Sequence, residues 1–281
     1  MNNTTALSVD NMNLADAMGF QASSLGSPQT SLYRVTVTVI QEVDKETSKI
    51  VSSPVFKIVR DEEEVYCRDI SVRFFAERQR WQKWDSVANN MQKSVMSNTL
   101  NADLKDTLGT FNLGRPSGYI KDFAALPDAQ KDVIRSVNRV KVMMGMATLS
   151  DPFYEGGAPA TGFDGEIPFV SDVKNRDSLK YIGASVDKLM RKSISPVEHT
   201  IILEGETRAM PNGNKYAVIT SSLGELVGFA DGDNDMLQSF VEYVQRSNEY
   251  ILNKWDEVHV EGLSSEDADI VNSIVDVQDF E

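Results

Sequence analysis

Residues 71–84 combine the two side-chain types that an unpaired nucleic acid strand binds. The stretch reads Ser-Val-Arg-Phe-Phe-Ala-Glu-Arg-Gln-Arg-Trp-Gln-Lys-Trp, with four aromatic rings and four cations against one acid. Bases stack on aromatic side chains with roughly 1–3 kcal/mol each, and Lys or Arg side chains hold the phosphates. We therefore predict a nucleic-acid-binding surface here, built from Arg73, Phe75, Arg78, Arg80, Trp81, Lys83 and Trp84.

A second stretch, residues 109–119, has the glycines and the proline of a loop. It carries a cation and rings that could lie beside the first stretch, so we add Arg115 and Tyr119 to the predicted surface. An ordinary surface connection explains the same residues. Its segment 114–118 does not match a phosphate-binding P-loop, because the Gly-Lys-Ser/Thr ending is absent.

The first stretch also fits a strand and turn whose rings face the core, with arginine stems covering the edge. Side chains alternate between the two faces of a strand. One face would then carry Ile70, Val72 and Phe74, and the other Ser71, Arg73 and Phe75. The sequence leaves both the binding surface and the core interpretation open.

The net charge of −14 argues at first against nucleic acid as a ligand. The charge is, however, unevenly distributed. Residues 256–281 hold nine acids and no Lys or Arg, whereas 21 basic and 18 acidic residues lie between Arg68 and Lys215. A mildly basic middle thus precedes an acidic tail, and the middle can still attract phosphates.

Composition excludes several classes of protein. The 281 residues are 41% hydrophobic and 25% charged, which is typical of a globular protein. No apolar run approaches the ~20 residues of a membrane span, and the first residues do not resemble a signal peptide. With one cysteine, Cys67, and two histidines, we expect a cytoplasmic protein without a disulfide, zinc or another cofactor.

No pattern of catalytic residues stands out. Residues 231–242 resemble a calcium loop in their acids, but Met236 stands where the glycine belongs, and an acidic helix start explains them. We find no Ser/His/Asp or Cys/His arrangement. Scattered carboxylates could hold Mg²⁺, although no spacing singles them out: Asp103, Asp106, Asp122 and Asp172. We predict no enzymatic activity.

The apolar periodicity predicts several strands and helices. Asn212-Gly213 marks a hairpin. The predicted strands are 33–40, 55–59, 65 to about 76, 139–149, 198–208 and 215–221. The predicted helices are one capped by Asp85, a second piece over 101–108, and 128–136, 178–192 and 233–257. We expect residues 151–164 to form a flexible insertion.

These elements indicate an α+β fold, with an antiparallel sheet or β-barrel, inserted helices and a long C-terminal helix. We favour an OB-fold-like barrel, since its strand faces and loops bind oligonucleotides. The predicted organisation is a mobile N-terminal arm (1–30), an OB-like core (31–258) and an acidic C-terminal tail (259–281).

A polar arm, a basic-aromatic β core and an acidic tail ending near an aromatic together resemble a bacteriophage replication-type single-stranded DNA-binding protein. The resemblance is one of layout across the chain. It implies sequence-independent coating of single-stranded DNA and recruitment of replication or recombination proteins by the tail. It also implies that the tail lies over the DNA groove and competes with phosphates. The partner-binding residues would be Asp276, Asp279, Phe280 and Glu281.

Two alternatives remain open at this point. In the first, the protein is a non-enzymatic structural or interaction protein of a virus, its rings are core and its tail only solubilises. In the second, the scattered carboxylates serve a metal-dependent nuclease.

Overall fold

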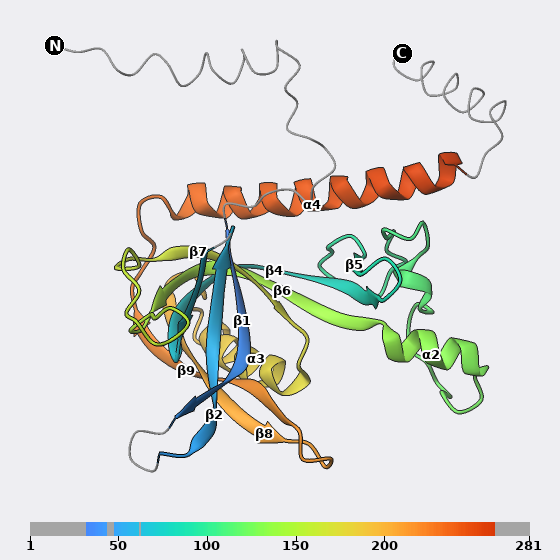
Figure 1. Cartoon of the computed structure of the whole chain (residues 1–281). Coiled ribbons are helices and arrows are strands. Elements are labelled where there is room, and N and C mark those ends of the chain that lie inside the picture. The colour runs from blue at the N-terminus through green and yellow to red at the C-terminus, as the bar shows by residue number, and fades with distance from the viewer. Residues whose placement is uncertain (1–31, 44–47, 62, 262–281) are drawn as a thin grey trace, which may run out of the picture.

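Nine strands form one curved mixed sheet, and helices lie on its faces (Figure 1). The computed structural model describes residues 32–43, 48–61 and 63–261. The predicted N-terminal arm and residues 262–281 of the predicted tail lie outside these ranges. The strand order is β3-β2-β1-β7-β6-β4-β8-β9, and β5 pairs with β4. The strands are β1 (Tyr33–Val43), β2 (Ile50–Arg60), β3 (Glu63–Cys67), β4 (Asp69–Asp85), β5 (Asn90–Lys93), β6 (Asn138–Leu149), β7 (Ile167–Val173), β8 (His199–Ala209) and β9 (Lys215–Leu226).

The predicted α+β class is confirmed, but the sheet is not a closed barrel. Strands β3 and β9 are the two ends of the strand order, and no ladder joins them within the described ranges. The sheet instead curves until β8 faces β2, so that a Cβ at Gly205 would lie 2.7 Å from the Cβ of Pro54. Neighbouring strands are antiparallel except β1 and β7. The helices are α2 (Asp128–Ser136), α3 (Arg176–Arg191) and α4 (Asp233–Glu261), with a 3-10 turn η1 (Asn112–Gly114).

The inside of the curve holds the larger core. Phe56, Ile70, Phe74 and Phe169 are buried there, as the alternation of apolar residues in their strands requires. Ile70, Val72 and Phe74, which were expected to share one face of the strand, all belong to this core. Residues 151–164, which were expected to form a flexible insertion, form no helix or long strand. They are nevertheless attached to the core, because the side chain of Phe163 is buried in it.

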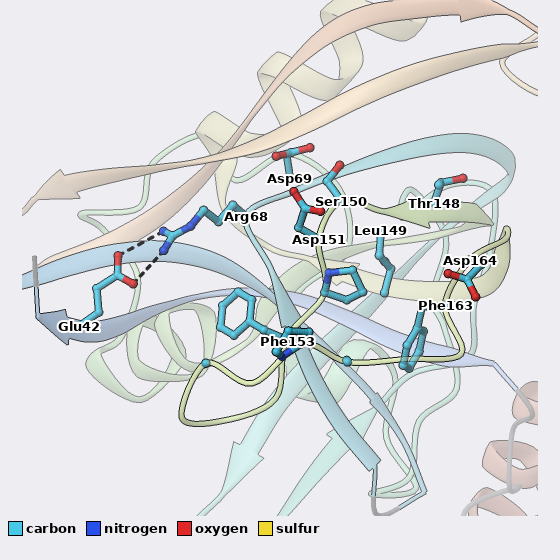
Figure 2. A pocket seen from close by; sticks show the side chains of 14 residues that line it. Glu42, Arg68, Asp69, Thr148, Leu149, Ser150, Asp151, Phe153, Phe163 and Asp164 are labelled. Atoms are coloured by element: carbon cyan, nitrogen blue, oxygen red, sulfur yellow. Dashed lines mark hydrogen bonds and ion pairs between the residues drawn. The ribbon is translucent and has the colours of Figure 1, made fainter. Parts of the chain in front are cut away.

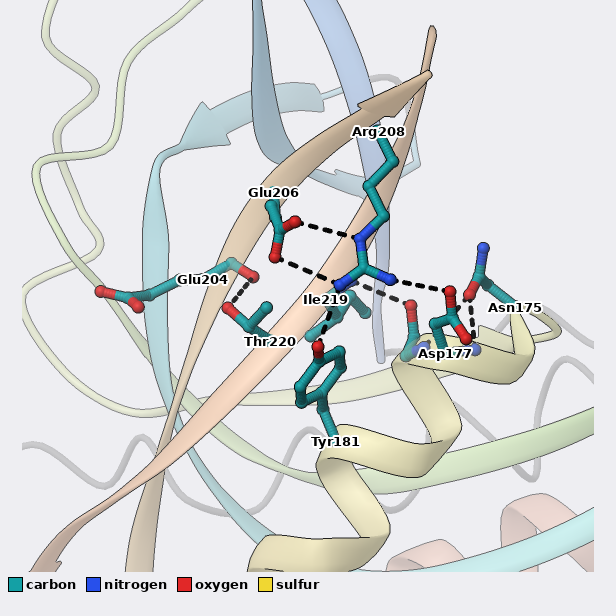
Figure 3. Close-up of polar contacts among 9 residues, drawn as sticks. Asn175, Asp177, Tyr181, Glu204, Glu206, Arg208, Ile219 and Thr220 are labelled. Carbon is teal, nitrogen blue, oxygen red and sulfur yellow. Dashed lines mark hydrogen bonds and ion pairs between the residues drawn. The ribbon is translucent and has the colours of Figure 1, made fainter. Parts of the chain in front are cut away.

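Helix α3 covers the open side of this core and contacts β9. Asn175 caps it by accepting hydrogen bonds from the amides of Asp177 and Ser178, and Ile182 and Leu189 are buried. On the surface, the guanidinium of Arg208 in β8 donates to Asp177 and to the hydroxyl of Tyr181, which joins the β8–β9 hairpin to the helix (Figure 3).

The 29-residue helix α4 lies across the opposite face of the sheet (Figure 1). Phe240 and Val244 pack there against Val142 and Met144 of β6. The ring of Phe75 contacts that of Phe240 edge-on at 5.7 Å between centroids. Among the helices of the described ranges, none is long and apolar enough to cross a membrane.

A β-bulge divides the long strand β4. The ladder with β6 shifts register between Phe74 and Ala76, so Phe75 is the extra residue. Gly145 lies opposite, and a Cβ on it would meet the carbonyl oxygen of Arg73 at 2.0 Å. Only glycine fits there, and the bulge turns both Phe75 and Ala76 toward α4, since both pack against its core cluster.

Beyond the bulge, β4 and β6 extend into a distal lobe formed with β5 and α2 (Figure 1). The helix predicted after Asp85 is wrong. The Asp85 carboxylate does accept from the amides of Val87 and Ala88, as a cap would. Asn89 then takes a φ of 51°, the chain reverses, and β5 returns antiparallel to β4.

The second helical piece predicted for residues 101–108 is also wrong. The buried Asp106 carboxylate holds this segment in a loop by accepting from the amides of Leu108, Thr110 and Leu113. Such side-chain to backbone bonds compete with helical hydrogen bonds.

Candidate nucleic-acid interface

Arg73 lies inside the protein, with 4% of its surface exposed. Its guanidinium donates to both oxygens of Glu166, at 2.7 and 2.6 Å, and to both oxygens of Asp233, at 2.8 and 3.0 Å. The carbonyl of Val197 accepts a further bond. This arginine joins the residue before β7 to the start of α4, and we withdraw it from the predicted surface because its donors are already used.

Arg80 is also buried, with 2% of its surface exposed. Its Nη2 donates to Asp172 at 2.6 Å, and the same carboxylate oxygen accepts from Gln82 at 3.0 Å. Burial opposes the charge of Asp172, but Arg80, Arg34 and Lys93 together hold its pKa below the ordinary value. Arg80 is therefore not the exposed phosphate ligand that was predicted. It does line a groove, which is described below.

The remaining predicted residues of β4 lie on two faces, because side chains alternate along a strand. After the bulge, Arg78 and Trp84 share the α4 face with Arg80. Trp81 and Lys83 point the other way. The nine predicted residues therefore do not form one surface.

The α4 face contains a groove between the helix and the β4–β5 hairpin, with a volume of about 450 Å³. We call it the α4 groove. It is lined by side chains from β1, β4, β5 and α4, and none of its lining residues is Asp or Glu. Its cations are Arg34, Arg80, Lys93 and Lys254, and its rings are Tyr243 and Tyr250.

Lys93 has the most perturbed charge in the groove. Burial, and next the neighbouring charge of Arg80, lowers the pKa of its ammonium to about 8. Burial likewise raises the pKa of the Tyr243 hydroxyl, which stays a neutral donor at neutral pH. The groove therefore combines desolvated cations with neutral hydroxyls.

Trp84 lies beside the groove mouth. It pairs across the hairpin with Met91, a lining residue, so the two side chains are on one face. Trp84 is 53% exposed and Met91 is 37% exposed. An exposed indole next to several cations is the combination that an unpaired strand binds.

On the opposite face, the guanidinium of Arg115 lies over the ring of Trp81, 4.8 Å from its centroid. Arg115 also donates to the carbonyl of Ile134, and burial lowers its pKa. Trp81 is half-buried, and no hydrogen bond to its ring nitrogen exists within the described ranges. The predicted meeting of the 109–119 loop with the aromatic stretch thus occurs through Arg115, whereas the side chain of Tyr119 is 91% exposed.

A larger cavity of about 770 Å³ lies elsewhere, beside the loop that follows β6 (Figure 2). Four carboxylates line it, against the single cation Arg68, which is paired with Glu42. The acids are Glu42, Asp69, Asp151 and Asp164. An anionic ligand is disfavoured there, so size alone does not identify the site.

The carboxylates considered for a metal have other partners. Asp106 holds its own loop, Asp172 binds Arg80, and Asp103 accepts from Asn112. No cluster of three or more His, Cys, Asp or Glu suited to a metal ion exists in the described part of the chain. Burial raises the pKa of the Cys67 thiol to about 12, so this side chain is packed rather than reactive.

The groove residues Arg34, Lys93, Tyr243, Tyr250 and Lys254 were not among those predicted. One signal was available, since residues 243, 247, 250 and 254 recur at the spacing of one helix face. The predicted partner-binding residues Asp276, Asp279, Phe280 and Glu281 lie outside the described ranges. Comparison of the chain with protein-family models, curated proteins and solved structures found no match.

Proposed function

We propose that this protein binds single-stranded DNA without sequence preference, and that the strand lies along the α4 groove. The observation that carries the proposal is the lining itself, which has four cations and no Asp or Glu beside the exposed ring of Trp84. Two carboxylates behind the lining pair with three of these cations, Asp172 with Arg80 and Arg34, and Glu257 with Lys254. Phosphates would bind Arg34 and Lys254, and bases would stack on Trp84 and Tyr250.

Two features favour a single strand over a duplex. A groove of about 450 Å³ beneath a helix has the size of a small-ligand site, far too small for a double helix. Stacking on an indole also needs a base whose face is free. In this proposal the open curved sheet has the role that an OB-fold-like barrel has in other single-strand binders.

The acidic net charge fits the proposal because it is concentrated at one end of the chain. Residues 256–281 carry nine of the acids. We propose that this tail recruits replication or recombination proteins through Asp276, Asp279, Phe280 and Glu281, in the cytoplasm of the host cell if the chain is viral.

Titration of the tryptophan fluorescence with oligo-dT tests the proposal. We expect quenching at low salt and an affinity that falls steeply as salt rises, since bound cations release counterions from the strand. Lys254→Gln should weaken binding several-fold and lower the salt slope by about 0.7, the value for one phosphate contact on a single strand. Lys188→Gln, on exposed α3, is the matched control and should change neither quantity.

Absence of oligo-dT binding at low salt would refute the proposal and favour the structural or interaction protein. That alternative has its own observation, an exposed apolar segment that starts at the last residue of β9 and leads toward α4, and that holds Leu226, Val227 and Phe229.

A further inference from the structure

Lys93, which lines the α4 groove, is a cation whose charge the neighbouring acid Asp172 balances only in part. Its ammonium forms no hydrogen bond or ion pair with any described residue, although its side chain is largely removed from water. Buried ammonium groups are usually paired, because desolvation of an isolated charge is costly. The groove therefore has an excess of positive charge around Lys93.

One carboxylate, that of Asp172, faces these cations. Its Oδ2 is bound by Arg80 at 2.6 Å, by Gln82 and, at 3.7 Å, by Arg34, while its buried Oδ1 has no hydrogen-bond partner within the described ranges. Asp172 also acts on Lys93 through its charge, so a single negative charge stands against three positive ones. Moreover, the Nε of Arg80 has no hydrogen-bond partner within the described ranges.

The three cations come from three strands, Arg34 from β1, Arg80 from β4 and Lys93 from β5. All three line the groove, and the hydroxyl-bearing Thr107 and Tyr243 line it as well. A planar carboxylate is satisfied by one guanidinium fork, whereas a tetrahedral oxyanion accepts hydrogen bonds from several sides. The excess of two positive charges also suits a phosphate better than a carboxylate.

We propose that Arg34, Arg80 and Lys93 form a discrete site for one phosphate group at the floor of the α4 groove. The inference rests on the proposed function for its main ligand, a backbone phosphate of the bound strand. Free inorganic phosphate offers the same chemistry and serves as the probe.

The site has a characteristic pH dependence. Besides Arg34 and Arg80, the groups that face Lys93 are Gln82 on β4, Asp172 on β7, and Tyr243, Tyr250 and Lys254 on α4. Of these neighbours, Asp172 has a pKa below its ordinary value and Tyr243 one above it, so neither titrates near pH 8. Lys93 loses its proton as the pH rises through about 8, and a bound phosphate opposes that loss. The affinity for a given ionic form of phosphate should therefore fall between pH 7 and 9.

Isothermal titration of the full-length chain with inorganic phosphate, at pH 7 and pH 9, tests the site directly. Because inorganic phosphate itself loses a proton near neutral pH, the affinities are compared for the phosphate dianion. We expect the affinity for the dianion to be at least tenfold lower at pH 9 than at pH 7. Lys93→Gln should lower the affinity for the dianion at pH 7 at least tenfold and remove the difference between the two pH values. Arg34→Gln, at a half-exposed position, should lower it without removing that difference, and Lys188→Gln should leave it unchanged. Thermal unfolding confirms that each variant is folded.

The same variants titrated with oligo-dT separate this inference from the proposed function. Weaker oligo-dT binding by Lys93→Gln supports both. If phosphate binds through Lys93 while oligo-dT does not bind at all, the site stands and DNA is not its ligand. If folded Lys93→Gln binds phosphate and oligo-dT as the unchanged chain does, or if the unchanged chain binds no phosphate, the proposed site is refuted.

Discussion

The side-chain amide of Asn248 in α4 binds both backbone polar groups of Met96. Its Oδ1 accepts from the Met96 amide at 2.7 Å, and its Nδ2 donates to the Met96 carbonyl at 3.0 Å. This pair of bonds joins the middle of α4 to the segment after β5, so it holds together the two walls of the α4 groove. The two bonds satisfy the backbone groups of Met96 that an adjacent strand would bind in a continuous sheet.

Asn248→Ala should therefore loosen the distal lobe. The change leaves two buried backbone groups without partners, and each costs about 1–3 kcal/mol. We expect faster amide hydrogen exchange in residues 94–115 and a lower free energy of unfolding. Asn253→Ala, on the exposed side of the same helix, is the control. Equal exchange in the two variants would contradict this role.

Arg73→Met should destabilise the fold strongly. It leaves Glu166 and Asp233 without their shared cation, and removal of one partner of a buried ion pair costs roughly 3–5 kcal/mol. Urea unfolding measures the loss. Arg78→Met is a suitable comparison, since among the described residues Arg78 donates only to the carbonyl of Glu77. A loss below about 1 kcal/mol for Arg73→Met would show that the pair is not a structural anchor.

The same arginine predicts an acid-dependent stability. The hydrogen bonds from Arg73 lower the pKa of Asp233 in the folded chain, whereas the unfolded chain keeps the ordinary value near 3.8. The carboxylate therefore stabilises the fold at pH values above about 4, and this contribution is lost as the pH falls further. Urea unfolding at pH 7, 4 and 3 should show a steeper decline in the unchanged chain than in Asp233→Asn. Parallel declines would contradict the assignment.

The two neighbouring tryptophans should respond differently to removal. Trp84→Ala should weaken oligo-dT binding by roughly 1–3 kcal/mol with little change in stability, because its ring is half exposed and available for stacking. Trp81→Ala should instead lower stability, because its ring packs under Arg115. Paired thermal unfolding and fluorescence anisotropy with labelled oligo-dT measure both effects. The reverse pattern would place the strand on the Trp81 face.

Deletion of residues 262–281 should tighten oligo-dT binding most at low salt. The deleted segment contains six acids and no Lys or Arg, and a tethered anion competes with phosphates within the ~8–10 Å screening length. The gain should shrink as salt rises. Replacement of the six acids by Asn or Gln keeps the length and should reproduce the effect. Unchanged affinity at every salt concentration would mean that the tail does not reach the groove.

Much of the fold followed from local patterns. Asn212-Gly213 marked the β8–β9 hairpin, and the apolar spacing of residues 178–192 marked α3, because both signals depend on near neighbours. The turn after Asp85 was missed, since its side chain makes the same amide bonds at a helix start and in a tight turn. The positive φ of Asn89 decided between them.

The candidate site was harder to predict, because the acids that pair with its arginines lie far away in the sequence. Arg73 lies 93 residues from Glu166 and 160 from Asp233, and no local pattern predicts such a pairing. A cluster of arginines in a strand can equally face phosphates or neutralise buried acids. The groove could not be predicted from local patterns either, because β1, β5 and α4 come together only in the tertiary fold.

The bulge at Phe75 has a consequence for the composition of the groove. Side chains of β4 alternate between the two faces of the sheet. One extra residue therefore changes the face on which every later side chain of the strand lies. With the bulge, the even-numbered Arg80 and Trp84 face α4, while the even-numbered Phe74 before it faces the core. Removal of that single residue would exchange the two faces, and Trp81 and Lys83 would enter the groove in place of Trp84 and Arg80. One backbone irregularity, accommodated by Gly145, thus selects which half of the aromatic-cationic stretch the groove displays.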